Sequence, residues 1–150
     1  MNAYDTLARL SVPVPGGLLK EKTKGGQKLT FCAWYDLCDL MDERAPGWCS
    51  DVRVVPGPDP TVIVRVTVPT DDGPITREAT GTDDEPESSY GSPLDRAEAS
   101  ALRRVFAKFG LGRELYQGKG VLWRQAKRQA DVARANSAQH KVDAPDAAAA

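Results

Sequence analysis

Lysines and glycines gather in one short stretch near the start of the chain. Residues 20–28 hold four lysines and one acid, and Gly25 and Gly26 lie before the last of these lysines. Lysine ammonium groups bind phosphates as point charges, and glycine lets the backbone approach them closely. The stretch lacks the pattern G-x-x-x-x-G-K-[ST], so it does not predict nucleotide hydrolysis by a phosphate-binding loop of that type.

Three aromatic residues follow the lysines, at Phe31, Trp34 and Tyr35. Aromatic rings beside basic groups are typical of surfaces on which nucleic-acid bases stack. Rings at helical spacing are more often part of a core, and we expect Trp34 in particular to be buried there. Base stacking is therefore an open alternative for this stretch.

Cysteine and histidine supply little chemistry. Cys32, Cys38 and Cys49 form no C-x-x-C pair, and their odd number fits no closed disulfide framework. The one histidine, His140, lies in a polar, alanine-rich segment. These features argue against Ser-His-Asp or Cys-His catalysis and against a structural zinc site. We expect no catalytic residue, no metal and no cofactor.

Charge is divided along the chain. The total is 20 Lys and Arg against 21 Asp and Glu, but residues 69–101 carry a net charge of −7 and residues 102–134 a net charge of +7. The near-neutral total therefore does not exclude a phosphate-bearing partner, because the basic groups can converge on one surface. A charge run can also be a solvated helix face, but few acids lie four residues from Arg104 and Lys108.

Hydrophobic periodicity predicts the elements that position these residues. We expect helices over residues 2–10, 30–44 and 92–110, and strands over 48–55, 61–68 and 75–80. Expected helix boundaries are Asn2, Thr30 and Ser92 at the starts and Gly110 at an end. A weaker helix is predicted over 121–134, before an alanine-rich tail.

Short turns between consecutive strands favour an antiparallel meander. The sequence thus predicts an α+β fold in which a three-stranded antiparallel sheet packs against helices. The chain's 150 residues fit one domain with an appendage. No apolar run is long enough for a membrane span and no secretion pattern is present, so we expect a soluble, cytoplasmic protein.

Several segments in order resemble the N-terminal domain of Rad52-type single-strand annealing proteins. They are Gly25–Phe31 (GGQKLTF) before the Trp34–Met41 segment, Val64-Arg65-Val66, Asp72-Gly73 with Ile75–Glu78, and Ala97–Gly110 followed by Leu111-Gly112 and Leu115-Tyr116. The motifs Trp34-Tyr35-Asp36 and Ala45-Pro46-Gly47-Trp48 are especially similar to the DdrA branch, the DNA-damage-response proteins of radiation-resistant bacteria. The similarity spans roughly residues 20–116.

The resemblance implies a β-β-β-α core, assembly into homo-oligomeric rings, and single-stranded DNA held in a basic groove. It assigns DNA binding and oligomerisation to residues 1–116 and leaves 117–150 as a basic helical extension and tail. The DNA contacts that it implies are Lys20, Lys22, Lys24, Lys28, Phe31, Arg103, Arg104 and Lys108. Lys108 is one position away from the family's third helical base, where Ala107 stands, and Glu21 occupies a position that is basic in the family.

The function that the resemblance implies is DNA repair and recombination without catalysis. Such a protein binds single-stranded DNA, including 3′ ends, protects those ends and anneals complementary strands, and it is associated with the bacterial nucleoid. No bond is made or broken in any of these steps, so the protein is not expected to be an enzyme.

Three alternatives stay open at this point. The order helix, three strands, helix is also that of double-stranded RNA-binding modules. A metal-dependent nuclease could use Asp71, Asp72 and Glu78. A purely structural protein could use the helices over 31–44 and 92–110 as oligomer interfaces.

Overall fold

A computed structural model describes residues 1–24, 26–83, 91–117 and 132–136, without the side chains of Lys24, Gln27 and Gln117. The chain divides into two compact units, residues 1–115 and 116–150. Most of the helix predicted over 121–134 lies outside the described residues. Within the described part of the chain, no helix combines the length and the apolar character needed to cross a bilayer.

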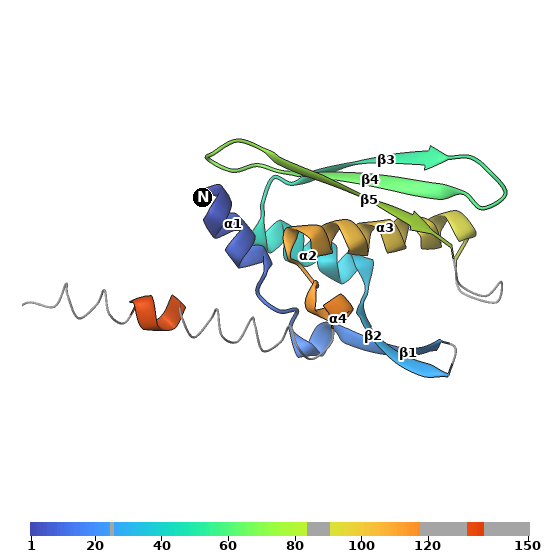
Figure 1. Cartoon of the computed structure of the whole chain (residues 1–150), viewed down its shortest axis with the longest axis horizontal. Helices are drawn as coiled ribbons and strands as arrows, with labels where there is room; N and C mark the ends of the chain where they lie inside the picture. The colour runs from blue at the N-terminus through green and yellow to red at the C-terminus, as the bar shows by residue number, and fades with distance from the viewer. Residues whose placement is uncertain (25, 84–90, 118–131, 137–150) are drawn as a thin grey trace, which may run out of the picture. The chain divides into compact units, whose positions relative to one another are not determined.

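The first unit combines helices with a hairpin and a three-stranded sheet (Figure 1). In chain order they are α1 (Ala3–Leu10), a 3-10 turn η1 (Gly16–Leu18), β1 (Leu19–Lys24), β2 (Gln27–Cys32), α2 (Trp34–Arg44), β3 (Cys49–Val55), β4 (Thr61–Val68), β5 (Ile75–Thr82), α3 (Pro93–Phe109) and α4 (Glu114–Gln117), which crosses into the second unit. Strands β3, β4 and β5 form an antiparallel sheet in that order, and β1 pairs with β2 alone. The predicted α+β class with a three-stranded antiparallel sheet on helices is confirmed.

Helix α3 covers β4 and β5 on one face of the sheet (Figure 1). Every second residue of β4 is a valine that faces α3, and all four are fully buried: Val62, Val64, Val66 and Val68. Gly81 of β5 lies so close to α3 that an added Cβ would stand 2.2 Å from the Ala97 carbonyl oxygen. This close backbone contact fixes α3 on the sheet.

Local signals set the ends of α3 as predicted. The Ser92 side chain accepts a hydrogen bond from the Asp95 backbone N–H, and the Asp95 side chain bonds back to the Ser92 backbone. This capping box satisfies two donors that the first helical turn leaves unpaired. At the other end, Gly110 has φ = 112°, a left-handed conformation that glycine adopts without strain.

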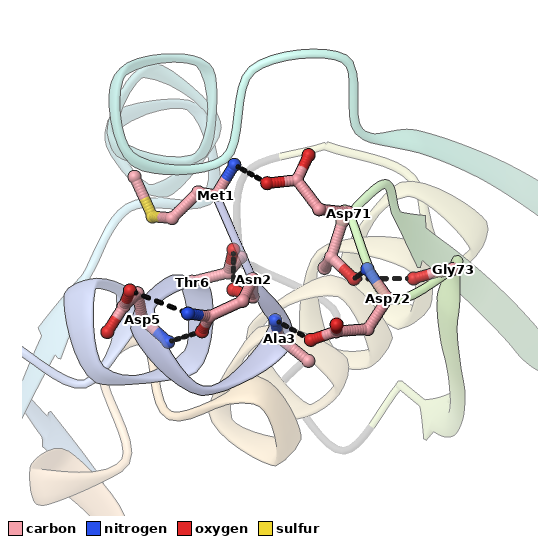
Figure 2. Close-up of polar contacts among 9 residues, drawn as sticks. Met1, Asn2, Ala3, Asp5, Thr6, Asp71, Asp72 and Gly73 are labelled. Atoms are coloured by element: carbon pink, nitrogen blue, oxygen red, sulfur yellow. Dashed lines mark hydrogen bonds and ion pairs between the residues drawn. The ribbon is translucent and has the colours of Figure 1, made fainter.

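Helix α1 is tied to the turn between β4 and β5 (Figure 2). The Met1 amino group lies 2.6 Å from an Asp71 carboxylate oxygen, and the Ala3 backbone N–H donates to Asp72 at 2.8 Å. The predicted cap of α1 is confirmed, since the Asn2 side chain accepts from the Asp5 backbone N–H. Both aspartates therefore have structural partners.

The region of residues 19–33 differs from the prediction. The helix expected from Thr30 begins at Trp34 with Ala33 as its N-cap, and the lysine-rich stretch is a β-hairpin with a turn at Gly26, whose φ is 77°. Cross-strand pairing with residues 19–24 holds Phe31 in a strand, although its spacing to Trp34 resembles a helix. The expected core position of Trp34 is also wrong, because this side chain is 45% exposed.

Candidate nucleic-acid interface

The register of the β1–β2 hairpin divides its basic residues between two faces. Lys20 lies opposite Phe31 and Lys22 opposite Leu29, so these four side chains share one face. Lys28 lies opposite Thr23 and so belongs to the other face. The hairpin therefore does not bring all the predicted lysines together.

Lysines and aromatic rings interleave on the first of these faces. The Lys22 Nζ lies 5.4 Å from the centroid of the Phe31 ring, and the Lys20 Nζ donates a hydrogen bond to the Tyr35 hydroxyl at 2.7 Å. The Lys20 Nζ is also 4.9 Å from the Tyr35 ring centroid, but because it bonds the hydroxyl we take the hydrogen bond as the main contact. That bond raises the pKa of Lys20 above its ordinary value.

Helix α2 adds a second exposed ring at its first residue. Trp34 packs edge-to-face on Tyr35, with 5.7 Å between ring centroids and 78° between ring planes. We name Lys20, Lys22, Phe31, Trp34 and Tyr35 the basic–aromatic surface. Sequence reasoning assigned Trp34 to the core. Periodicity gives no signal against that assignment, since adjacent residues of α2 can both be buried.

The remaining hairpin lysines are Lys28 and Lys24. Lys28 is exposed, and its Nζ is 3.9 Å from a Glu21 carboxylate oxygen, a long contact between two exposed groups. Lys24 ends β1 opposite Gln27, and its side chain lies outside the described residues. The acid at position 21 thus accompanies Lys28 on the face opposite the basic–aromatic surface.

Two of the three predicted bases of α3 bind backbone groups of β5. Arg104 donates to the Thr80 carbonyl oxygen at 2.9 Å, and Lys108 donates to the Glu78 carbonyl oxygen. Strand β5 is an edge strand, and alternate carbonyls of an edge strand have no partner within the sheet. Arg104 and Lys108 therefore cap the β5 edge.

Arg103, the third predicted base, is directed to a different part of the molecule. Burial raises the pKa of the Cys32 thiol, and the nearby positive charges of Lys20 and Arg103 oppose this effect. Both cations therefore lie within electrostatic reach of the buried thiol where β2 ends. Arg103 and Lys20 thus share Cys32 as a neighbour, whereas Arg104 and Lys108 bind β5.

The three acids of the nuclease alternative do not converge. Asp71 and Asp72 hold α1, whereas Glu78 lies on the outer face of the sheet and accepts from Arg53 at 2.8 Å and from Arg65 at 2.7 Å. Among the described residues, no group of three or more potential metal ligands is present. These carboxylates hold elements of the fold together.

Comparisons with known proteins identify relatives in DNA repair. The chain is 35% identical over 116 residues to the DNA repair RAD52-like protein 1, mitochondrial, of Arabidopsis thaliana, covering 75% of this chain and 66% of that protein. It is 38% identical over 89 residues to the DNA repair RAD52-like protein 2, chloroplastic, of the same plant, covering 57% of this chain and 45% of that protein. It is 34% identical over 140 residues to the single-stranded DNA-binding protein DdrA of Deinococcus deserti, covering 86% of this chain and 66% of that protein. No family model matches the chain. The matches thus span from under half to about two thirds of each relative's length.

Proposed function

We propose, from the premise that the chain belongs to the Rad52-type family and is related to its DdrA branch, that it binds single-stranded DNA in DNA repair. The observation that supports this function best is the basic–aromatic surface. It places two lysines beside two exposed rings, Trp34 and Tyr35, and the half-buried Phe31, a combination typical of surfaces that bind single-stranded nucleic acid.

The two kinds of side chain have different tasks in this proposal. Lys20 and Lys22 bind backbone phosphates, and Arg103 extends the positive potential toward α3. Phe31 contacts the DNA strand next to Lys22. Lys24 and Lys28 stay candidate phosphate ligands at the hairpin end.

Arg104 and Lys108 remain proposed DNA contacts, but each also binds a carbonyl oxygen of β5. A guanidinium has five N–H donors, so Arg104 can bind the Thr80 carbonyl and still offer donors to a phosphate. Lys108 has three N–H donors, and one of them binds the Glu78 carbonyl oxygen. We expect these two residues to contribute less to DNA affinity than Lys20 and Lys22.

A salt titration of binding tests the proposal. The affinity for fluorescent oligo-dT should fall steeply with salt, because bound phosphates release counterions, with a log–log slope of about −0.7 per phosphate contact. The double variant Lys20→Ala/Lys22→Ala should flatten that slope by about 1.4. Arg53→Ala/Arg65→Ala changes the net charge equally on the outer face of the sheet and should leave the slope unchanged.

Other outcomes would overturn or redirect the proposal. Binding without a salt slope would exclude phosphate contacts as its basis. Unaltered binding by folded Arg103→Ala/Arg104→Ala protein would remove α3 from the interface. Tighter binding of duplex RNA than of oligo-dT would favour the double-stranded RNA module, and Mg²⁺-dependent degradation of DNA would favour the nuclease.

We also propose that copies assemble into a ring that shields 3′ ends and brings complementary strands together for annealing. Strand β3 supports self-association, because it is an edge strand exposed along its length, with Val52 and Val54 on the same face as the buried valines of β4. Negatively stained electron micrographs should show rings that take up oligo-dT, whereas particles of single copies would contradict assembly. A DNA partner would place such a protein with the nucleoid in the cytoplasm.

A further inference from the structure

The exposure of Trp34 has no explanation in the packing of the fold. Tryptophan buries a large apolar area when it joins a core, yet Trp34 is 45% exposed and the adjacent Tyr35 48% exposed. The core of α2 is instead built from Leu37, Leu40 and Met41. The two adjoining rings thus form an apolar patch that the rest of the first unit leaves nearly half exposed.

The patch lies against positive charge. Tyr35 contacts Trp34 through its ring and holds the Lys20 ammonium through its hydroxyl, so one tyrosine joins an indole and a cation. An occupant of this site must offer both a flat apolar surface and a negative group. A nucleotide unit of single-stranded DNA has both, in its base and its phosphate.

We propose that Trp34 is a base-stacking residue and that Tyr35 is a positioning residue, which orients the Trp34 ring and holds Lys20 for the adjoining phosphate. This inference rests on the proposed function and adds a contact to bases. The pair is nearly perpendicular, so the two rings face different directions and a base can stack on one without displacing the other. Stacking accepts any base, because every base has a π face.

The inference separates base contacts from phosphate contacts, and the experiment compares two ligands that differ in bases alone. Oligo-dT and an abasic oligonucleotide of equal length carry the same phosphates. The wild-type protein should bind oligo-dT about tenfold more tightly than the abasic strand, as one good stacking contact provides. Trp34→Ala should remove most of that difference and leave the salt slope unchanged, while Trp34→Phe should retain part of it.

Two further variants complete the design. Tyr4→Ala removes an aromatic ring of α1 that is 76% exposed, and it should bind both ligands as the wild type does. Tyr35→Phe keeps the ring and removes the hydroxyl that holds Lys20, so its smaller loss should be equal for the two ligands.

Failure of the proposed function and failure of the stacking inference give different results. If neither the wild type nor any variant binds oligo-dT or the abasic oligonucleotide, the proposed function itself fails and the inference with it. If oligo-dT binds with a salt slope but Trp34→Ala keeps the wild-type preference for bases, the stacking role alone is overturned. A Trp34→Ala protein whose base preference persists while its assembly size changes in gel filtration would assign the patch to a contact between copies.

Discussion

Basic side chains have two different roles in this molecule, one on the β1–β2 hairpin and one on α3. Lys20 contacts the exposed Tyr35, and Lys22 lies over the half-buried Phe31 ring. Arg104 and Lys108 donate to carbonyl oxygens of β5. The comparison teaches that side chains of equal charge lie beside aromatic rings or cap a strand edge, according to the backbone next to them.

The position of β5 accounts for the role of the α3 cations. Strand β5 is at the edge of its sheet, and α3 packs directly on it, so unpaired carbonyls and long basic side chains meet there. The opposite edge, β3, is exposed along its length, and none of the described helices packs closely over it (Figure 1). We infer that the two edges differ in their availability to a second copy, with β3 the open one.

The largest expected effect concerns the close contact of β5 and α3. In Gly81→Ala the new Cβ would meet the Ala97 carbonyl oxygen and the Ala101 backbone nitrogen, which belong to helix backbone and cannot turn aside. We expect a loss of about 3 kcal/mol in the free energy of unfolding, measured by urea denaturation. Gly57→Ala is the matched control, because a Cβ there meets open space.

A small loss for Gly81→Ala would mean that α3 can move away from the sheet at little cost. Arg104 and Lys108 would then be free to leave the β5 carbonyls, and the contrast between the two groups of cations would weaken.

The parts of the fold that local signals determine could be predicted from the sequence. Ser92, Asp95 and Gly110 define the ends of α3 through contacts within a few residues. The β4 segment is rich in β-branched residues, so it could be predicted as a strand without knowing which strands it pairs with. The hairpin was missed because its strand identity depends on pairing between residues 19–24 and 27–32.

The candidate site was predictable in composition but not in orientation. Charge and glycine content identified Lys20 and Lys22, yet the register of the hairpin decides that Lys28 lies on the other face. The partners of Arg104 and Lys108 are carbonyls 24 and 30 residues away, beyond the reach of periodicity. The exposure of Trp34 likewise depends on where β2 ends and α2 begins.

The second prediction compares the two groups of cations directly. Arg104→Ala/Lys108→Ala removes two hydrogen bonds to β5 and should cost about 2 kcal/mol of stability, or about 1 kcal/mol for each bond. Lys20→Ala/Lys22→Ala should cost less, no more than about 0.5 kcal/mol, since the Tyr35 side chain that Lys20 bonds is itself 48% exposed. Urea denaturation of both proteins in the same buffer measures the difference, and equal losses would contradict the division of roles.

The smallest expected effect is on the pH dependence of stability. It should distinguish the ion pairs of Glu78 on the sheet from the Glu21–Lys28 pair in the hairpin. The hydrogen bond from Arg65, aided by the charge of Arg53, lowers the pKa of Glu78 below its unfolded value of about 4.3. A carboxylate with a lowered pKa stabilises the fold above that unfolded value, and the stabilisation is lost as the pH falls through the folded pKa. Glu78→Gln should therefore be less stable than the wild type at pH 7, with a difference that shrinks steadily below about pH 4.

The matched control for Glu78→Gln is Glu21→Gln in the hairpin. Its carboxylate lies 3.9 Å from the Lys28 ammonium and both groups are exposed, so this pair should add no measurable stability at any pH. Urea denaturation of each variant and the wild type from pH 2.5 to 7 gives the two difference curves. A flat curve for Glu21→Gln beside a falling one for Glu78→Gln would show that fixed geometry on the sheet, and not the presence of an ion pair, gives a carboxylate its contribution. Two flat curves would mean that the Arg53–Glu78–Arg65 contacts are as weakly coupled to folding as the hairpin pair.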